Sequence, residues 1–321
     1  MTEANERARA ERESGEQRET KTAAPSPPPV VRRVADLRDA TAGFRADGER
    51  IALVPTMGAL HAGHLSLITH AARHAERIIV TIFVNPTQFA EGEDLDAYPR
   101  TEADDLAKLA RLPVDLVYAP SPREMYPDRF ATSVSVTGLT DGLCGTSRPH
   151  FFGGVATVVC KLFTQARPDI AVFGEKDFQQ LLVIRRMARD LDLGVEVFGA
   201  PIVRENDGLA LSSRNAYLDE KARATAPKLH ALSVHARNLI VDGHAVPKVL
   251  AGLRSRLTEA GFAVDYAEVR HAETLSPLDI VGDAPARLFV AAVLGETRLI
   301  DNLPIERQRG WADQAPAHEP R

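Results

Sequence analysis

Short apolar runs that end in turns, with helical stretches between them, limit the folds open to this chain more than any other feature. From about residue 31 the runs are "IALVPT", "RIIVTIFV", "VDLVYAP", "DIAVFG" and "GVEVFG", and helical patterns such as "TEADDLAKLARL" separate them. Strands that alternate with helices form parallel sheets, and continuously apolar strands are buried on both faces. The order therefore predicts a doubly wound, parallel-sheet α/β domain over residues 30–203.

The pattern changes after "LSSRNAYLDEKAR". Two helical stretches, roughly Glu220 to Ile240 and Val246 to Ala260, come before the strand-like runs "VDYAEVR", "RLFVAAV" and "TRLIDN". Helices grouped ahead of strands indicate an α+β arrangement. We predict a smaller C-terminal α+β domain over residues 204–305, with the boundary near Pro201 to Arg214.

The two ends of the chain differ in composition from the rest. Residues 1–29 contain no Leu, Ile, Val, Phe, Tyr or Trp and end in "TKTAAPSPPP". A segment of that composition buries too little apolar surface to offset its chain entropy. We predict a disordered leader over residues 1–29 and a flexible tail over residues 306–321.

Charge and composition exclude several classes of protein. The formal net charge of -5 over 321 residues leaves no basic surface of the kind that drives nucleic-acid binding. The two cysteines, Cys144 and Cys160, are too few for a disulfide scaffold or a four-cysteine zinc site. No apolar run reaches the roughly 18 residues of a membrane span, and the N-terminus lacks a secretory signal. We expect a cytoplasmic protein with no membrane or nucleic-acid partner.

The stretch "PTMGALHAGH" lies between the run "IALV" and the helical pattern "LSLITHAARHA". A turn that follows a strand and opens a helix directs backbone N–H groups and the positive helix end outward, which suits a phosphate. His61 and His64 share one face of that helix, so both imidazoles can donate hydrogen bonds to phosphates. A capped helix with two surface histidines is the alternative. A zinc site is disfavoured, because no glutamate lies between the histidines and no third ligand is clustered with them.

Uncharged amides follow the second strand. "FVNPTQF" brings Asn85 and Gln88 to the carboxyl end of that strand, where ligands collect in open α/β sheets. Amides there suit a substrate's hydroxyl or carboxylate group, and an ordinary Asn-Pro turn is the alternative. Four carboxylates follow: Glu91, Glu93, Asp94 and Asp96. They could indicate a metal site, but a charged loop that leads into a helix is the commoner explanation of such a cluster.

Two further motifs carry cations and hydroxyl groups. In "FGEKDFQQL", Lys176 can reach phosphate oxygens, Asp177 can cap the next helix, and Gln180 lies one turn further on. In "VRENDGLALSSRN", donors to a polyphosphate are available from Ser212, Ser213 and Arg214. A common helix start and a serine-rich cap are the alternatives.

Together, in this order, the four motifs resemble those of the pantothenate synthetase family, the pantoate–β-alanine ligases. "PTMGALHAGH" is similar to the family's H-I-G-H signature, "FVNPTQF" to its substrate-amide segment, "FGEKDFQQL" to its lysine motif, and Asn206 to Asn215 to its K-M-S-K-S loop. The resemblance covers about Val31 to Pro304. It implies a nucleotide-binding domain similar to class I aminoacyl-tRNA synthetases and nucleotidyltransferases, and a homodimer.

The resemblance implies a ligase that joins pantoate to β-alanine, with ATP as co-substrate and Mg²⁺ as cofactor. The carboxylate of pantoate attacks the α-phosphate of ATP and gives pantoyl adenylate and pyrophosphate. The amine of β-alanine then attacks the acyl carbon and releases pantothenate and AMP. No metal site built from protein side chains is predicted.

The resemblance also implies roles for single residues. His64, His61, Lys176 and Arg214 are implied as catalytic, with both histidines stabilising the phosphates and His64 as proton donor. Gln88 and Gln180 would hold pantoate, with Asn85 near them, and Arg148 is kept as a substrate-site residue. ATP contacts are implied for Met57, Gly58, Ala59, Leu60, His61, Ala62, Gly63, His64, Gly174, Glu175, Lys176, Asp177, Val203, Leu211, Ser212, Ser213 and Arg214.

The chain departs from the family pattern at two places. Where the family has R-P-x-H-F-x-G-V, this chain has "RPHFFGGV", so Phe151 takes the place of the histidine and His150 lies one position earlier. We interpret the segment as a loop and leave His150 out of the site. Leu211 stands where methionine is common, which is a volume-conserving exchange.

Other functions are open at this point. A nucleotidyltransferase also uses H-x-x-H and a basic loop, but the amides Asn85, Gln88 and Gln180 argue against it. A nucleotide-binding regulatory protein without activity is supported by Phe151 alone. A tRNA-charging enzyme is disfavoured by the acidic charge and the missing anticodon-binding part.

Overall fold

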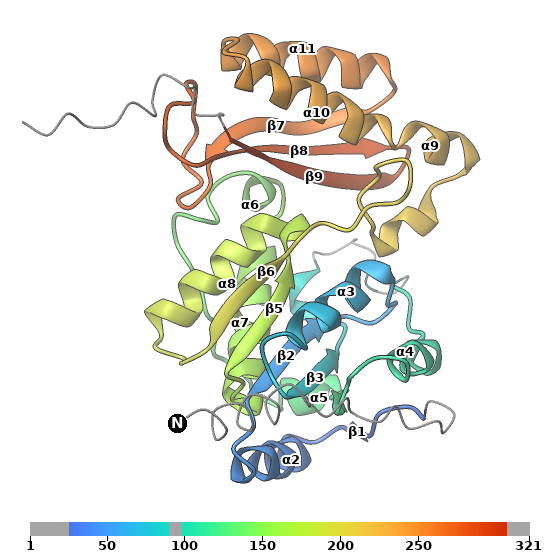
Figure 1. Ribbon diagram of the computed structural model, residues 1–321, viewed down its shortest axis with the longest axis vertical. Helices are drawn as coiled ribbons and strands as arrows, with labels where there is room; N and C mark the ends of the chain where they lie inside the picture. The colour runs from blue at the N-terminus through green and yellow to red at the C-terminus, as the bar shows by residue number, and fades with distance from the viewer. Residues whose placement is uncertain (1–25, 90–94, 96–97, 307–321) are drawn as a thin grey trace, which may run out of the picture.

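The computed structural model of the chain describes residues 26–89, 95 and 98–306 (Figure 1). The predicted leader up to residue 25, the predicted tail from residue 307, and Glu91, Glu93, Asp94 and Asp96 lie outside the described residues. The end of the predicted leader belongs to the fold, since Pro28 is buried and the carbonyl of Pro29 accepts a hydrogen bond from Val117 N at 2.9 Å. Proline lacks an amide donor but keeps its carbonyl, so it can join the edge of a sheet.

A six-stranded parallel sheet forms the larger domain, in the order β1-β4-β3-β2-β5-β6. Its strands are β1 (Val30–Val31), β2 (Ile51–Thr56), β3 (Arg77–Ile82), β4 (Leu116–Tyr118), β5 (Ile170–Gly174) and β6 (Glu196–Ala200). The predicted doubly wound α/β fold is confirmed. From β2 the chain adds strands on one side and then returns to add β5 and β6 on the other, so the strand order reverses between β2 and β5.

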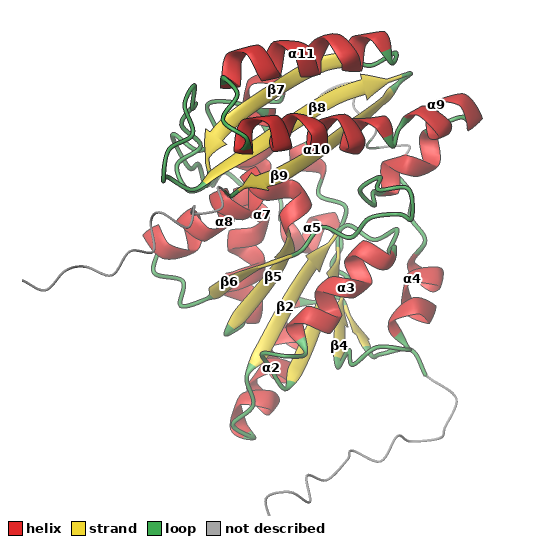
Figure 2. Cartoon of the chain, turned by 45° about the horizontal axis from the view of Figure 1, so that its top comes forward, coloured by secondary structure: helices red, strands yellow, loops and turns green. Residues whose placement is uncertain are grey.

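Successive residues of β2 are buried on opposite faces of this sheet. Ile51 and Leu53 pack in one core with α2 (Val34–Ala46), α7 (Phe151–Ala166) and α8 (Phe178–Asp190). Ala52 and Val54 pack in another with α3 (Ala62–Ala71) and α4 (Glu102–Leu109). Helices therefore cover both faces (Figure 2), which explains why the strands are continuously apolar.

The segment after Arg148 is a helix and not the loop expected for it. α7 follows the short helices α5 (Pro122–Met125) and α6 (Cys144–Ser147), and most of its side chains are buried. A Cβ added to Gly154 in its first turn would lie 2.4 Å from the carbonyl oxygen of Thr87. The glycine is needed for close packing of α7 on the segment that carries Asn85 and Gln88, and a pattern of residue types does not reveal this.

The smaller domain is a three-stranded antiparallel sheet with helices on one face (Figures 1 and 2). Leu288 and Val290 of its central strand pack with the helices, whereas Phe289 packs with the core of the larger domain. The predicted α+β arrangement is confirmed, but the predicted helix from Glu220 to Ile240 is divided at Pro227, which lacks the amide hydrogen of a helix interior. The elements are α9 (Glu220–Thr225), α10 (Lys228–Val241), α11 (Val246–Glu259), β7 (Ala263–His271), β8 (Ala286–Leu294) and β9 (Thr297–Ile305).

Candidate active site

A cleft of about 1090 Å³ lies between the two domains, where the carboxyl ends of β2, β3 and β5 face β9. It is centred where the strand order reverses, which is where open α/β sheets bind ligands. Residues of all four motifs line it: Met57, His61, Gly63, His64, Asn85, Gln88, Gly174, Lys176, Asp177, Gln180, Val203, Leu211, Ser212, Ser213 and Arg214, together with Arg148. The fold thus brings the predicted groups together from distant parts of the chain.

The histidine turn, residues Met57 to His64, places its two imidazoles together at the start of α3. Nδ1 of His61 accepts a hydrogen bond from Gly63 N at 3.1 Å and so caps the helix. Nδ1 of His64 accepts one from His61 N at 3.4 Å, and the two ring centroids are 4.0 Å apart. Because each Nδ1 is an acceptor, the proton of each neutral ring is on Nε2. The capped helix considered as an alternative is present, and the Nε2–H groups remain as donors at the cleft wall.

Both imidazoles are uncharged at neutral pH. Burial, helped by the ammonium groups of Lys176 and Lys108, lowers the pKa of His61 to about 4. Burial lowers the pKa of His64 to about 3, and the neighbouring His61 and Lys176 contribute to the same shift. The ligand-free site therefore presents neutral N–H donors beside a cation, which suits hydrogen bonding to phosphate oxygens rather than release of a proton.

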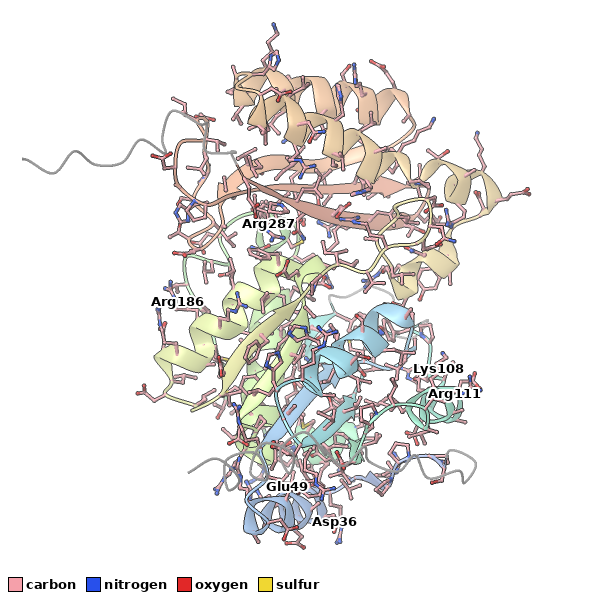
Figure 3. The ribbon with its side chains drawn as sticks, in the orientation of Figure 1. Asp36, Glu49, Lys108, Arg111, Arg186 and Arg287 are labelled. Carbon is pink, nitrogen blue, oxygen red and sulfur yellow. The ribbon has the colours of Figure 1, made fainter. Side chains whose placement is uncertain are left out.

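A buried carboxylate that sequence reasoning did not find holds the histidine turn. Asp105 of α4 is 0% exposed, and its oxygens accept from Ala59 N at 2.9 Å and Leu60 N at 2.7 Å. Lys108, labelled in Figure 3, donates to the carbonyl of Leu60 at 2.7 Å. The available signal was a carboxylate four residues before the buried Leu109, on the apolar face of a predicted helix.

Part of the predicted ATP-contact set does not line the cleft. Ala59 and Leu60 give their amides to Asp105, and the Glu175 carboxylate lies 3.3 Å from the guanidinium of Arg287. These groups support the loops instead of forming the wall. The predicted ATP-contact residues that do not line the cleft are Gly58, Ala59, Leu60, Ala62 and Glu175.

Asn85 uses its polar atoms inside the protein. It is 1% exposed; its Nδ2 donates to the carbonyl of Gly154 at 3.1 Å and to Oε1 of Gln88 at 3.2 Å, and its Oδ1 accepts from Tyr126 Oη at 2.7 Å. Gln88 in turn donates to Met57 Sδ at 2.7 Å. The geometry thus gives Asn85 a supporting part at the cleft wall, because its amide is directed toward Gly154 of α7 and toward Gln88.

The lysine motif follows β5 as the short 3₁₀ helix η2 (Glu175–Asp177). Nζ of Lys176 lies 3.7 Å from Oδ2 of Asp177, and the aspartate side chain makes no capping bond to α8. Asp177 thus holds the N-cap position of α8, but the expected side-chain cap is not formed. Gln180, on the first turn of α8, lines the same wall.

The serine–arginine loop, residues Val203 to Asn215, folds back on itself, with Leu211 N donating to Val203 O at 3.0 Å. Oγ of Ser212 accepts from Arg214 N at 3.3 Å, so the serine caps η3 (Ser213–Tyr217) and also lines the cleft. A Cβ added to Gly63 would lie 3.6 Å from Cβ of Leu211. The loop therefore packs directly against the histidine turn.

The family model for pantoate-beta-alanine ligase matches residues 29–304. The chain belongs to the pantoate–β-alanine ligase family. It is 54% identical over 282 residues to a pantothenate synthetase of Nitrobacter hamburgensis, covering 88% of this chain and 100% of that protein. A crystal structure of pantothenate synthetase from Thermus thermophilus has a TM-score of 0.81 and 47% identity, covering 86% of this chain and 99% of that chain. A Francisella tularensis pantoate-beta-alanine ligase complexed with beta-gamma ATP and beta-alanine has a TM-score of 0.74 and 31% identity, covering 88% of this chain and 99% of that chain.

Membership of the pantoate–β-alanine ligase family confirms the family, fold and activity predicted from the four motifs. The activity is the ATP-dependent condensation of pantoate with β-alanine. The match spans both domains, which sets aside the nucleotidyltransferase, regulatory and tRNA-charging alternatives. Within the described residues, no helix has the length and apolar character needed to cross a membrane.

The departure from the family's ligase pattern falls inside the cleft. Phe151 lines the wall, and Cζ of Arg148 lies 4.0 Å from the centroid of its ring. Arg148 Nη2 also donates to the carbonyl of Gln88 at 3.2 Å. His150 precedes α7 and is exposed. An aromatic ring that supports a guanidinium through a cation–π contact therefore occupies the place of the family's histidine.

Proposed function

We propose that this cleft carries out both steps of pantothenate formation, with phosphate-binding groups and acid-binding groups on different parts of its wall. One observation carries the proposal: the uncharged His61 and His64 lie beside Lys176 and against the serine–arginine loop. Gln88 and Arg148 meet each other at another part of the wall. N–H donors and cations are thus gathered where a triphosphate can bind, and the amide of Gln88 lies where pantoate can bind.

In the first step, a carboxylate oxygen of pantoate attacks the α-phosphorus of ATP, and the bond to the bridging oxygen of pyrophosphate breaks. Negative charge develops on the phosphate oxygens. Lys176 and Arg214 neutralise it, helped by the hydroxyl groups of Ser212 and Ser213. His61 and His64 donate hydrogen bonds from Nε2. Donors that are already in place stabilise this charge without reorganising at the moment of reaction.

Pantoate is held by polar and apolar groups together. Gln88 and Gln180 hydrogen-bond its hydroxyl and carboxylate groups, while Asn85 keeps Gln88 in place. The branched alkyl centre of pantoate packs against the apolar side chains that α7 contributes to the wall, which are Val155, Val158, Val159 and Leu162. This pairing of a few amides with an apolar surface is typical of small-molecule sites.

In the second step, the amine of β-alanine attacks the acyl carbon of pantoyl adenylate. The C–N bond forms, the acyl–oxygen bond to AMP breaks, and the nitrogen loses a proton to solvent. Arg148, supported by Phe151 and close to Gln88, is the cation that pairs with the carboxylate of β-alanine. This pairing would orient the amine toward the acyl carbon.

Mg²⁺ enters this site with ATP. In the part of the chain that the structure describes, no group of three or more His, Cys, Asp or Glu side chains could hold a metal ion. Mg²⁺ is commonly bound by one or two carboxylates and substrate phosphates, without a protein cage, and Asp177 at the cleft wall fits that arrangement. When bound, the ion neutralises charge on the pyrophosphate that leaves.

The protein acts as a homodimer in the cytoplasm. The dimer is supported by the resemblance to the ligase family, and the location by the need for ATP as co-substrate. Sedimentation equilibrium of the full chain should give twice the monomer mass; a monomer at micromolar concentration would contradict the dimer.

The two steps can be tested separately. Exchange of labelled pyrophosphate into ATP, with Mg²⁺ and pantoate but no β-alanine, reports adenylate formation. Release of AMP reports the whole reaction. We expect exchange with pantoate alone, and AMP when β-alanine is also present. Absence of exchange from an enzyme that forms pantothenate would contradict the adenylate step, and exchange without pantoate would contradict the assigned acid.

A further inference from the structure

Two neighbouring polar residues of β9 are buried in a strand that the sequence pattern shows as mainly apolar. Asp301 and Asn302 are each 3% exposed. Successive side chains of a strand point to opposite faces, and these two contact different loops of the cleft. Neither of them lines the cleft or takes part in the chemistry proposed above.

Asn302 holds the lysine motif. Its Nδ2 donates to the carbonyl oxygens of Glu175 and Lys176, at 2.9 Å in both cases. Its Oδ1 accepts a hydrogen bond from Nη1 of Arg287. One buried amide thus fixes the two peptide groups on either side of the Lys176 side chain.

Arg287 of β8 completes this contact. It lies between the small sheet and the larger domain (Figure 3) and is 7% exposed. Its Nη2 is 3.3 Å from Oε2 of Glu175, and its Cζ is 3.8 Å from the centroid of the Phe178 ring at the start of α8. The lysine motif is therefore held by β8 and β9 through both its backbone and its flanking side chains.

Asp301 holds the serine–arginine loop. Its two oxygens accept from Nη1 and Nη2 of Arg204, each at 2.8 Å, and its Oδ2 lies 3.0 Å from Nδ1 of His230. Nη1 of Arg204 also donates to the carbonyl of Gly208 at 3.1 Å, within the loop. A bidentate pair between guanidinium and carboxylate is geometrically specific. Asp301 therefore fixes the part of the loop that leads to Ser212.

We propose that Asn302 and Asp301 are positioning residues of the adenylation step. Asn302 sets the position of the Lys176 ammonium, and Asp301 sets that of the serine–arginine loop. The inference rests on the proposed function of Lys176 and Arg214 as groups that neutralise phosphate charge. A displacement of about 1 Å at such a group can cost on the order of a hundredfold in rate, because it no longer meets the charge of the transition state.

The variant Asn302→Asp keeps the shape of the side chain and an acceptor for Arg287, but it loses the amide hydrogens that hold Lys176. We expect kcat of pantoate-dependent pyrophosphate exchange to fall about tenfold to a hundredfold, with little change in KM for pantoate. Gln165→Leu is the matched control, because Gln165 is a similarly buried amide that accepts from Tyr118 Oη at 3.2 Å and does not line the cleft. Its kcat should equal that of the wild type.

A double-mutant cycle tests whether Asn302 acts through Lys176. In a Lys176→Ala background, Asn302→Asp should lower the residual exchange by less than about twofold, because the positioned group is gone. A second cycle, Asp301→Asn with Arg214→Ala, tests the other loop in the same way. Wild-type kcat in the single variants, or equal fold losses in both backgrounds, would overturn the proposal.

Two controls accompany these cycles, one for folding and one for the proposed roles of Lys176 and Arg214. Thermal unfolding establishes that each variant is folded, and Asn302→Ala replaces Asn302→Asp in the cycle if the latter is not. An unchanged exchange rate in Lys176→Ala or Arg214→Ala would contradict the proposed function of that residue, whatever Asn302 and Asp301 do.

Discussion

The histidine turn and the serine–arginine loop pack against each other, but they are held in different ways. The histidine turn is fixed within its own domain by the buried Asp105, which accepts hydrogen bonds from two backbone amides. The serine–arginine loop is fixed by ion pairs: Arg204 with Asp301 at 2.8 Å, and Arg223 with Glu205 at 2.6 Å and with Asp207 at 2.7 Å.

The difference shows how the support of the cleft is distributed between buried and partly exposed groups. A buried acceptor shared by two amides gives one geometry, and its removal leaves both amides unpaired. Ion pairs at partly exposed sites, such as the two of Arg223, contribute little singly and are screened by salt. The histidine turn thus depends on hydrogen bonds to a buried side chain, whereas the serine–arginine loop divides its support between the buried Asp301 and the partly exposed pairs of Arg223.

The largest effect that would sharpen this comparison is expected from His64→Ala. Loss of one preorganised donor to the transition state should lower kcat of pyrophosphate exchange by about 100- to 1,000-fold. The thermal unfolding curve should stay close to that of the wild type. His70→Ala, on the same helix and outside the cleft wall, is the control and should keep full activity. Full activity in His64→Ala would remove the histidine from the mechanism.

Asp105→Ala tests the support that this buried carboxylate gives to the histidine turn. Two unpaired buried amides should lower the free energy of unfolding by about 3 kcal/mol, and displacement of the histidines should lower kcat by about tenfold to a hundredfold. Denaturant unfolding and pyrophosphate exchange measure the two losses. Asp104→Ala changes an exposed carboxylate one residue earlier and serves as the control. Equal results for the two variants would show that the turn is held by other contacts.

Arg223→Ala tests the charged support of the serine–arginine loop, and a smaller effect is expected. Its two ion pairs are about one-third exposed, so the loss in unfolding free energy should be about 1 kcal/mol or less. In about 0.5 M NaCl the difference from the wild type should shrink, because salt screens the pairs that the wild type retains. A loss as large and as salt-independent as that of Asp105→Ala would break the comparison.

The smallest expected change is in the pH dependence of activity. With pKa values lowered to about 4 and about 3, His61 and His64 stay neutral in the free enzyme. The profile of kcat/KM should therefore show no acid limb near pH 6.5, where an ordinary histidine titrates. A limb at that pH, absent from a His61→Gln/His64→Gln variant, would show that these histidines titrate in the free enzyme.

The same histidines have a consequence for stability. Below pH 6.5 the unfolded chain binds protons on these two residues while the folded protein does not. Their contribution to stability is complete above pH 6.5 and is lost as the pH falls to about 4 for His61 and about 3 for His64. The free energy of unfolding should therefore fall less steeply between pH 6.5 and 5 in the double glutamine variant than in the wild type.

Much of the fold could be predicted from the sequence because each strand of the larger domain is a short apolar run followed by a turn. The exception of most consequence is α7, whose start "FFGGV" carries paired glycines that ordinarily indicate a loop. The helix needs Gly154 because the backbone of Thr87 lies against it. That contact joins segments far apart in the sequence, so no local pattern reports it.

The residues that line the cleft could largely be predicted from the sequence, but the buried residues that support them could not. Groups such as Lys176 and Ser212 lie directly after strands or in exposed loops, where their chemistry is visible in the motif. Asp105 and Asn302 were missed, because a helix pattern and an apolar strand pattern each contain them without showing what they contact. Asn85 was placed in the right region, but the direction of its amide depends on Tyr126 and Gly154.

The two-residue turn between β8 and β9 sets the register of the strand that carries Asp301 and Asn302. Gly295 and Glu296 alone join the strands, with Leu294 paired to Thr297, and Gly295 adopts a φ of 62°, which suits a tight hairpin. If a residue added here were to shift β9 by a single position, every side chain of the strand would turn to the other face. Asp301 would then point toward the lysine motif, and Asn302, which holds that motif, would point away from it. The length of one hairpin thus determines which loop each of two adjacent residues can reach, and hence whether β9 holds both the lysine motif and the serine–arginine loop.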